Sequence, residues 1–227
     1  FFEVFLIITY IERRKDICVE EEKLPVKTLP EVSIIVPCFN EEKTICATLA
    51  SLFNLDYPKD KLKIIVIDDG STEAVQMSFA LDSRFHGNDK SKLVRFETNK
   101  GAPAARNEGF RLAKGELVMF LDADAELEPR TLARLKQVLD EHPDAAFAYP
   151  SFRFGGKLFR SRAFDVEALR EQNYIHTSVL MRREAFPGFD ESLKKFQDWD
   201  LFLSMAEKGL KGVLVDETLL SFKPRRD

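Results

Sequence analysis

The sequence predicts an α/β protein in which helices flank a mostly parallel sheet, with a small antiparallel portion in the C-terminal half. From Val32 onward, strand patterns alternate with helix patterns, an order that requires crossover helices between parallel strands. The chain has 227 residues, 44% of them hydrophobic, which suffices for one large domain with a full core. Between residues 145 and 159 the alternation of strand and helix patterns stops. The aromatic residues and the Gly-Gly pair in this segment are typical of antiparallel strands or of a long connection.

Apolar runs bounded by turn residues predict the strands of the first half. Pro37 is expected to end the first run, and the Asp-Asp-Gly-Ser turn at residues 68–71 ends the second. The expected strands cover residues 32–36, 63–67, 93–96 and 116–121.

Apolar residues at helical spacing predict the helices between these strands. Ile45, Leu49 and Leu52 share one face of the first helix, and Pro103 suits the first turn of a later one. The expected helices cover residues 41–53, a segment that starts at about residue 72, and residues 103–113.

The second half is expected to contain two more helices and another strand. The last helix is amphipathic and is closed by Gly209, a residue that favours helix ends. The polar stretch before the third strand reads as a surface loop or insertion. These segments are the helix at 129–139, the strand at 178–181, the helix at 196–208 and the loop at 82–92.

Charge and cysteine content exclude several classes of protein. With 34 basic and 38 acidic side chains, the net charge is −4, so the chain lacks the basic character of a general nucleic-acid binder. Cys18, Cys38 and Cys46 are odd in number and form no Cys-x-x-Cys, which indicates neither a disulfide framework nor a cysteine zinc site. A reducing compartment, the cytosol, fits this content best.

The N-terminal segment is apolar and is followed by basic residues. Residues 1–11 are too few to span a bilayer, and Arg13, Arg14 and Lys15 follow them closely. One interpretation is the end of a longer membrane helix, with the basic cluster at the inner face of the membrane. The other is an amphipathic helix packed on the domain. No basic region precedes the apolar run, so a signal peptide is disfavoured.

Polar residues follow three of the predicted strands at the point where each strand ends. Residues 37–41 follow the first, Asp68 and Asp69 the second, and Asp122 and Asp124 the fourth. In an open parallel sheet, ligands bind beyond the carboxyl ends of the strands. Crowded carboxylates repel one another unless a cation joins them, and Mg²⁺ or Mn²⁺ would serve, with further ligands from the phosphates of a substrate.

The chain has no glycine-rich phosphate-binding loop. The P-loop pattern is missing, and Gly-x-Gly-x-x-Gly does not follow the first strand, which disfavours P-loop enzymes and Rossmann dehydrogenases. Phosphates would then be held by a metal and a few basic side chains. Arg106 lies in a helix expected just after the third strand, so its guanidinium can face the same edge of the sheet. The alternative is a surface position, which is the more common one for a lone arginine.

Four motifs, in order and at matching spacing, resemble family 2 glycosyltransferases with the GT-A fold. They are Val-Pro-x-Phe-Asn-Glu at 36–41, Ile-Asp-Asp-Gly-Ser-Thr at 67–72, Asn-x-Gly-x-x-x-Ala-Arg-Asn at 99–107 and Phe-Leu-Asp-Ala-Asp-Ala at 120–125. The resemblance covers roughly residues 32–221. It implies transfer of a sugar from a nucleoside diphosphate sugar to a hydroxyl acceptor, with inversion at the anomeric carbon.

The resemblance also implies roles for individual residues. Phe39 would stack near the base, and Asp69 would contact the uracil or ribose, with Asp68 beside it. Asp122 and Asp124 form the Asp-x-Asp element, and Asp124 is the better candidate for direct metal ligation. Turn, cap or acidic-loop roles are the alternative for the four aspartates. The full set of expected donor-binding residues is Pro37, Phe39, Asn40, Glu41, Asp68, Asp69, Gly101, Arg106 and Asp122.

The resemblance places a catalytic base near the start of a late helix, where the usual preceding Glu is replaced by Gln197. Helical geometry separates the two candidates: Asp198 shares an apolar face with Phe202, whereas Asp200 lies on a polar face. A partly desolvated aspartate has a raised pKa, which suits a base, so we expect Asp198 to be the base and Asp200 to be simply solvated. Helix capping is the alternative role of Asp198. His176 lines the acceptor side or is a structural histidine.

The organisation that follows is an N-terminal segment and charged linker over residues 1–30 and a single transferase domain over residues 31–227. Its nucleotide-binding half would cover about 31–125 and its acceptor half about 126–222. The acceptor would be a lipid-linked sugar, a saccharide or another hydroxyl compound, used in cell-envelope polysaccharide or glycolipid synthesis at the inner face of the cell membrane.

Three points stay open at the level of sequence. The Gln-x-x-Arg-Trp element of processive synthases is missing, so either single sugars are added or the element lies beyond residue 227. A catalytically silent nucleotide-binding or partner-binding domain would keep the same fold, and Gln197 favours it slightly. A sugar-1-phosphate nucleotidyltransferase would need a glycine-rich loop near the first strand, and residues 37–41 do not form one.

Overall fold

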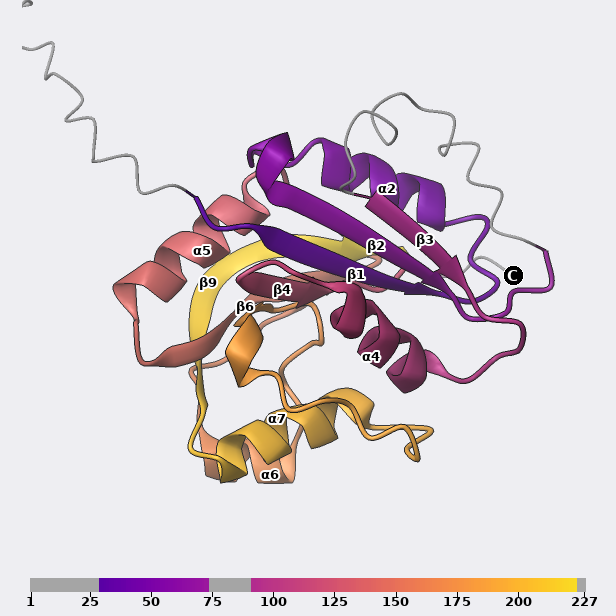
Figure 1. The fold of residues 1–227 in the computed structure, drawn as a ribbon. Coiled ribbons are helices and arrows are strands. Elements are labelled where there is room, and N and C mark those ends of the chain that lie inside the picture. The colour runs from indigo at the N-terminus through magenta and orange to yellow at the C-terminus, as the bar shows by residue number, and fades with distance from the viewer. Residues whose placement is uncertain (1–28, 74–90, 224–227) are drawn as a thin grey trace, which may run out of the picture.

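The computed structural model describes residues 29–73 and 91–223, whose strands form one nine-stranded sheet (Figure 1). The strand order is β3-β2-β1-β4-β8-β6-β9-β5, and β7 pairs with β6 outside this path. The strands are β1 (Val32–Cys38), β2 (Leu62–Asp68), β3 (Ser91–Arg95), β4 (Leu117–Phe120), β5 (Ala125–Leu127), β6 (Ala145–Phe154), β7 (Lys157–Phe159), β8 (Leu180–Arg182) and β9 (Lys211–Phe222).

Helices cover both faces of this sheet. Alternate residues of β1 point to opposite faces, as in any strand, so Ile34 packs in one apolar core and Ile35 in the other. The first core includes α2 and α5, and the second includes α4, α6 and α7. The helices are α2 (Ile45–Phe53), α4 (Ala102–Leu112), α5 (Thr131–Glu141), α6 (Val166–Glu171) and α7 (Gln197–Glu207), with short 3-10 turns at Lys59–Lys61 and Arg183–Ala185.

The pairing of the strands confirms the predicted fold class. Strands β3, β2, β1 and β4 are parallel, whereas β8 pairs antiparallel with both β4 and β6. The expected antiparallel segment is the hairpin of β6 and β7, which turns at Gly155 and Gly156. Strand β9 then runs parallel to β6, with register shifts that bend it (Figure 1). The two halves of the chain thus share one sheet.

Pro37 does not end the first strand as expected. It lies inside β1 and pairs in register with Ile67 of β2. The parallel register of β1 with β4 ends at Ile35, so Pro37 lies where β1 needs backbone hydrogen bonds on one side only. A residue without an N–H is tolerated there, as on an edge strand.

Three elements had not been predicted. Strand β5 is only three residues long, and α6 is a helix of six residues that Asp165 caps by accepting a hydrogen bond from the Ala168 N–H at 2.6 Å. Strand β9 has twelve residues, but Asp216 and Glu217 interrupt its apolar pattern where it bends. Prediction from periodicity needs an uninterrupted run of apolar residues. Strand β5 and helix α6 are too short to provide one, and the run in β9 is interrupted.

Close backbone packing sets the position of α4 on the sheet. A Cβ at Gly109 would lie 2.3 Å from Cγ2 of Ile35 in β1. Only glycine allows the helix to approach the strand this closely. The approach fixes Arg106, which lies three residues earlier on α4, relative to the carboxyl ends of the strands.

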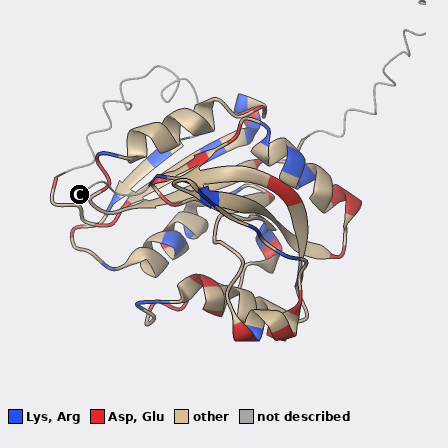
Figure 2. Cartoon of the chain, turned by 180° about the vertical axis from the view of Figure 1, so that it is seen from behind, with Lys and Arg blue, Asp and Glu red and all other residues tan. Residues whose placement is uncertain are grey.

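Several expectations lie outside the described residues. They are the apolar segment at 1–11, most of the helix that starts at about residue 72, and most of the loop at 82–92. Among residues 29–73 and 91–223, no helix combines the length and the apolar character needed to cross a membrane. Basic and acidic residues are interspersed over the surface elements (Figure 2).

Candidate active site

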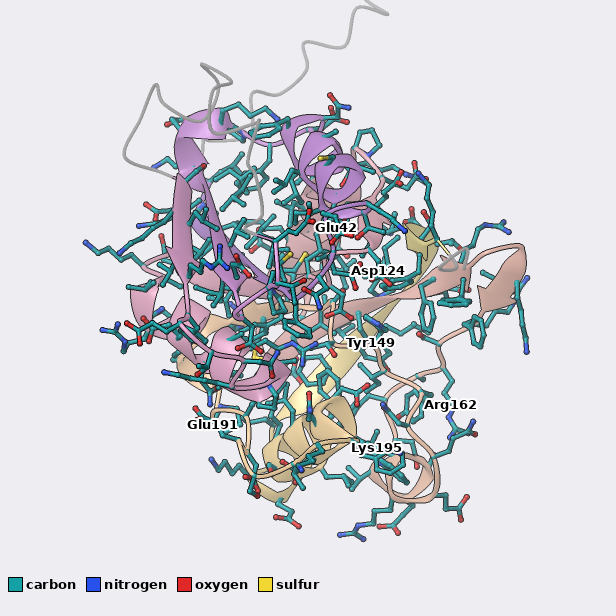
Figure 3. The ribbon with its side chains drawn as sticks, turned by 90° about the vertical axis from the view of Figure 1, so that its right-hand side faces the viewer. Glu42, Asp124, Tyr149, Arg162, Glu191 and Lys195 are labelled. Carbon is teal, nitrogen blue, oxygen red and sulfur yellow. The ribbon has the colours of Figure 1, made fainter. Side chains whose placement is uncertain are left out.

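The polar strand ends converge on a cavity of about 700 Å³ at the carboxyl edge of the sheet. Figure 3 looks onto this edge and labels Asp124, which follows β4, and Glu191, which precedes α7. A cavity of about 650 Å³ lies elsewhere, against Gly115 and Leu117 at the start of β4, and none of the predicted site residues lines it. Those that line the cavity at the carboxyl edge are Pro37, Phe39, Glu41, Asp69, Gly101, Arg106, Asp122 and Asp124. This cavity is called the donor cavity below, after the role that the sequence predicts for these residues.

Arg106 links the end of β4 to the start of α7. Its Nη2 donates to Asp122 Oδ1 at 2.8 Å and its Nη1 donates to Gln197 Oε1 at 3.2 Å. The side chain is only 9% exposed, and its Nε is buried without a hydrogen-bond partner. A buried cation with an unused donor at a cavity is suited to bind an anion, since a buried polar group without a partner is costly.

Asp122 lies between Arg106 and His176. Burial by itself would raise the pKa of Asp122, but the Arg106 guanidinium and His176 outweigh burial and hold that pKa below its usual value. Asp122 Oδ2 lies 3.6 Å from His176 Nε2, on the side away from Arg106. Asp122 is therefore an ionised carboxylate with a cation on one side and an imidazole on the other.

His176 has a defined tautomer in its neutral form. Burial lowers its pKa, although Asp122 and Asp198 act in the opposite direction. The backbone N–H of Ser178 donates to His176 Nδ1 at 3.1 Å, so in the neutral ring the proton is on Nε2. The Nε2–H then faces Asp122.

Two predicted donor-binding residues do not line the donor cavity. Asp68 is buried beside it, where its Oδ1 accepts the Ser71 N–H at 2.9 Å and its Oδ2 lies 3.6 Å from Arg95 Nε. Asn40 has a φ of 54°, and its Oδ1 accepts the Thr72 N–H at 2.9 Å. Both hold the turn after β2, which is the structural role that sequence had left as the alternative for Asp68.

Asp69 lines the donor cavity with both carboxylate oxygens already bonded. Its Oδ1 accepts the Lys100 N–H at 2.7 Å and its Oδ2 accepts the Gly101 N–H at 2.8 Å. These bonds fix the segment that leads into α4, where Gly101 has a φ of 96° that favours glycine. Asp69 thus shapes the wall of the cavity through the backbone.

A second cavity of about 330 Å³ adjoins the donor cavity through the contact between Asp122 and His176. It is called the acceptor cavity below, after the roles that the sequence predicts for His176 and Asp198. Asp198, at the start of α7, and Asn173, which follows α6, line it together. Asn173 Nδ2 donates to Asp198 Oδ2 at 2.8 Å, and Asn173 Oδ1 accepts the Ile175 N–H at 3.2 Å. The second bond fixes the orientation of the amide, so its N–H group points at the carboxylate.

Asp198 and Asp200 face different cavities, as the helical spacing predicts. Asp200, Ser204 and Glu207 line a separate cavity with residues 187–190. The expectation that Asp200 is simply solvated is wrong, because burial and the carboxylates of Asp190 and Glu207 raise its pKa. Its position in the cavity lined by Asn173 and His176 is what distinguishes Asp198.

The residues at the end of β4 fit a divalent cation. Asp122 and Asp124 are hard oxygen donors two residues apart on the wall of the donor cavity. Within the described residues, no group of three or more His, Cys, Asp or Glu side chains could hold a metal without help. Mg²⁺ and Mn²⁺ commonly use one or two carboxylates and take the remaining ligands from phosphates, so two aspartates suffice only with a bound diphosphate.

Sequence reasoning had not identified Asn173 or Lys194 as site residues. Asn173 lies in the stretch between β7 and β8 that carries no periodic pattern, and no local signal marks it. Lys194 lines the donor cavity. The sequence does contain a signal for it, since Lys194 and Lys195 directly precede the predicted helix at residues 196–208. Gln197 also lines the cavity, where Arg106 and Leu193 O hold its amide.

The chain resembles several known proteins in sequence. Residues 33–192 match the family model described as Glycosyl transferase family 2. Poly(ribitol-phosphate) beta-N-acetylglucosaminyltransferase TarS of Staphylococcus aureus is 35% identical over 180 residues, which are 73% of this chain and 30% of the relative. Amylovoran biosynthesis glycosyltransferase AmsB of Erwinia amylovora is 28% identical over 84% of this chain and 68% of the relative. The chain therefore spans less than a third of the length of TarS.

Solved structures share the fold. The S. aureus TarS structure in complex with UDP-GlcNAc has a TM-score of 0.71 at 23% identity, over 87% of this chain and 59% of the other. Mannosyltransferase PcManGT of Pyrobaculum calidifontis, solved with GDP-Man and Mn²⁺, has a TM-score of 0.68 at 23% identity, over 88% of this chain and 59% of the mannosyltransferase. These likenesses confirm the expected GT-A fold. From its ordered motifs and the match over most of its length, the chain belongs to glycosyl transferase family 2.

Proposed function

We propose that this chain is an inverting glycosyltransferase that moves a sugar from a nucleoside diphosphate sugar to a hydroxyl acceptor. The observation that carries the proposal is the position of Asp122, which contacts Arg106 in the donor cavity and faces His176 in the acceptor cavity. A transferase needs its two substrates side by side, with their reacting atoms about 3–3.5 Å apart. Family membership supports the same reaction class.

The donor is proposed to be UDP-linked, with its diphosphate near Arg106. Phe39 is 42% exposed and lines the cavity, so its ring is available to stack on a base. Arg106 and Lys194 supply positive charge to the same cavity. The structural relative solved with UDP-GlcNAc supports a uridine donor, although the mannosyltransferase was solved with GDP-Man. Asp69 would act by holding the residues that contact the nucleotide.

A divalent cation, Mn²⁺ or Mg²⁺, is proposed to bind with the donor at Asp124 and Asp122. When bound, such a cation offsets negative charge on the diphosphate. Asp124 would be the main ligand, as the Asp-x-Asp element of the family implies, with Asp122 beside it on the wall of the donor cavity. The mannosyltransferase solved with Mn²⁺ supports this assignment.

Metal dependence is tested by isothermal titration of UDP. We expect UDP to bind more tightly in Mn²⁺ than in EDTA, and Asp124→Ala to remove most of that difference. Asp122→Ala should remove less of the difference. Equal affinity of the wild-type protein in EDTA and in Mn²⁺ would exclude the metal from donor binding.

Asp198 is proposed to be the catalytic base of a single displacement. As the acceptor oxygen bonds to the anomeric carbon, the acceptor proton passes to Asp198. The bond from the anomeric carbon to the phosphate oxygen breaks, its electron pair leaves with the diphosphate, and the configuration inverts. Arg106 would bind that leaving group. Burial raises the pKa of Cys38, the thiol in the donor cavity, to about 12, which disfavours a covalent cysteine route.

The acceptor is proposed to belong to the cell envelope. The names of two relatives connect them to poly(ribitol-phosphate) and to amylovoran biosynthesis. The apolar residues 1–11, followed by basic residues, support a position at the inner face of the membrane. Fractionation of cells that express the complete gene product tests the position, and recovery wholly in the soluble fraction would contradict it.

Release of products separates the proposed function from its alternatives. The protein is incubated with UDP-sugars and candidate acceptors, and free UDP and pyrophosphate are both measured. A glycosyltransferase releases UDP in step with acceptor glycosylation. A nucleotidyltransferase would release pyrophosphate instead, and a silent domain would bind UDP without release of either product.

A further inference from the structure

We propose that the acceptor cavity recognises a phosphate group on the acceptor, close to the hydroxyl that receives the sugar. This inference rests on the proposed function and specifies its acceptor. The cavity that contains Asp198 is lined by Lys157 and Arg160, and Asp198 is the one carboxylate among its lining residues. A chain of net charge −4 therefore has basic residues around its acceptor cavity.

All charged residues of the chain segment that borders this cavity are basic, and two of them, Lys157 and Arg160, line it. Residues 145–164 contain Arg153, Lys157, Arg160 and Arg162 and no acidic residue. Elsewhere, basic and acidic residues are interspersed (Figure 2). Within the described part of the chain, neither Lys157 nor Arg160 forms an ion pair with a carboxylate. Their charges thus remain available to an anion that enters the cavity.

The backbone beside Arg160 is fixed before any ligand binds. Ser161 is buried; its N–H donates to Ser151 Oγ at 3.0 Å and its Oγ donates to Pro150 O at 2.9 Å. Tyr149 OH donates to the Arg162 carbonyl oxygen at 2.7 Å. These bonds tie the segment to β6, so Arg160 extends from a rigid base. Binding then costs less conformational entropy than with a mobile loop.

Aromatic rings form the apolar part of the same cavity. Phe152 and Phe159 are stacked, with ring centroids 5.1 Å apart and an angle of 3° between their planes. Lys157 Nζ lies 5.0 Å from the centre of the Phe159 ring. An apolar surface with cations at its edge suits a polyol or sugar whose carbon-bound hydrogens face the rings and whose phosphate meets Lys157 and Arg160.

These cations are separate from those assigned to the donor. Arg106 and Lys194 line the donor cavity, whereas Lys157 and Arg160 line the acceptor cavity. Arg153 provides a matched comparison, because it follows Phe152 on β6 and so points to the other face of the strand, outside the cavity. Loss of Arg153 removes the same charge from the same hairpin.

The test measures binding of acceptor probes in the presence of UDP and Mn²⁺. One probe is a pentameric glycerol phosphate, a second is N-acetylglucosamine linked to octyl diphosphate, and the third is an uncharged polyol of matching length. We expect a phosphate-bearing probe to bind at least tenfold more tightly than the uncharged polyol, with an affinity that falls as salt is added. The tighter of the two phosphate probes identifies a polyol phosphate or a lipid-linked diphosphate as the source.

Substitutions test the assignment to the cavity. Lys157→Ala and Arg160→Ala should each weaken binding of the phosphate probe roughly tenfold, which is the effect of one charge-assisted hydrogen bond. Arg153→Ala should change the affinity for that probe less than threefold. Equal affinity for charged and uncharged probes, or equal losses in all three variants, would overturn the inference. UDP affinity should be unchanged in every variant. If the wild-type protein itself failed to bind UDP, that result would overturn the proposed function, and this inference with it.

Discussion

At the scale of single residues, the site consists of polar groups that hold one another in place. Gln197 accepts from Arg106 and donates to Leu193 O, so the residue that departs from the usual Glu is an ordered part of the site. Glutamate at this position would pair ionically with Arg106 and compete with Asp122. With glutamine, Asp122 is the carboxylate that pairs with Arg106 among the described residues.

The proposed base can be tested by a pair of variants on α7. Asp198→Asn should lower kcat by ~10²–10⁴-fold and leave the Kd of the donor nearly unchanged, since a base acts only as the acceptor proton leaves. Asp200→Asn is the matched control, because Asp200 faces a different cavity, and its kcat should stay within a few fold of wild type. If Asp200→Asn is the inactive variant, the assignment of the base is wrong.

Asn173 is expected to position the base, which a pH profile can detect. Asn173→Asp places a second carboxylate where the amide now donates to Asp198 at 2.8 Å. Two neighbouring carboxylates raise the pKa of the pair, so the rising limb of kcat against pH should move to higher pH. A base acts only when ionised, so activity should fall most at low pH.

The control for this prediction is Asn173→Ala. It removes the hydrogen bond without adding charge, so kcat should fall across the whole pH range with a smaller shift of the limb. If Asn173 had a purely structural role, kcat would fall equally in both variants at every pH. That result would contradict the prediction.

At the scale of elements, sequence predicted the regular parts well and the ends of elements less well. The apolar spacing of Ile45, Leu49 and Leu52 identified α2, but the expected first turn at residues 41–44 is not part of the helix. Strands β1 and β2 follow from buried apolar runs. Strand β9 could not be predicted, because it is defined by its partners on β6 and β5 and not by its own pattern.

The close packing of α4 on β1 predicts a cost for any side chain at position 109. In Gly109→Ala, overpacking against buried Ile35 typically lowers the stability of the fold by about 1–3 kcal/mol. The better helix propensity of alanine offsets about 1 kcal/mol of this loss. We expect a net loss of about 1 kcal/mol in the free energy of unfolding, measured in urea. UDP should also bind more weakly, because α4 bears Arg106.

Gly156→Ala is the control for this packing effect. Gly156 lies in the turn between β6 and β7, and a Cβ there meets no atom within 4 Å. Its free energy of unfolding should change by less than about 0.5 kcal/mol. A Gly109→Ala protein as stable as wild type would show that α4 can move away from β1 without cost.

At the scale of the whole molecule, one sheet joins the two halves that are proposed to bind the donor and the acceptor. Convergence of the polar strand ends could be predicted, because parallel strands bring their carboxyl ends to one edge. On the acceptor side, Asp198 and His176 could be named from sequence, but Asn173 could not, because it lies in irregular chain whose position depends on how α6 packs against α7. Asp68 and Asn40 show a further limit, since a motif does not say which of its residues face the ligand and which hold the turn.

The shared sheet predicts that the two halves unfold together. Trp199, the one tryptophan of the chain, lies on α7, so its fluorescence reports on the acceptor half, whereas far-UV circular dichroism reports on the whole chain. The two urea transitions should coincide, as in a cooperative all-or-none transition. A fluorescence midpoint at clearly lower urea would show instead that the acceptor half unfolds on its own.

The pairing of β5 with β9 has a consequence for the order of assembly during synthesis. Strand β5 begins at the residue directly after Asp124, yet its partner is the end of β9, where Ala125 pairs with Phe222. A chain growing on the ribosome therefore contains every aspartate of the donor cavity about a hundred residues before it contains the strand that fixes the last of them. Because so distant a pairing forms late, a nascent chain that stops short of β9 should be unable to retain nucleotide. Binding of the donor would thus report that β9 has left the exit tunnel.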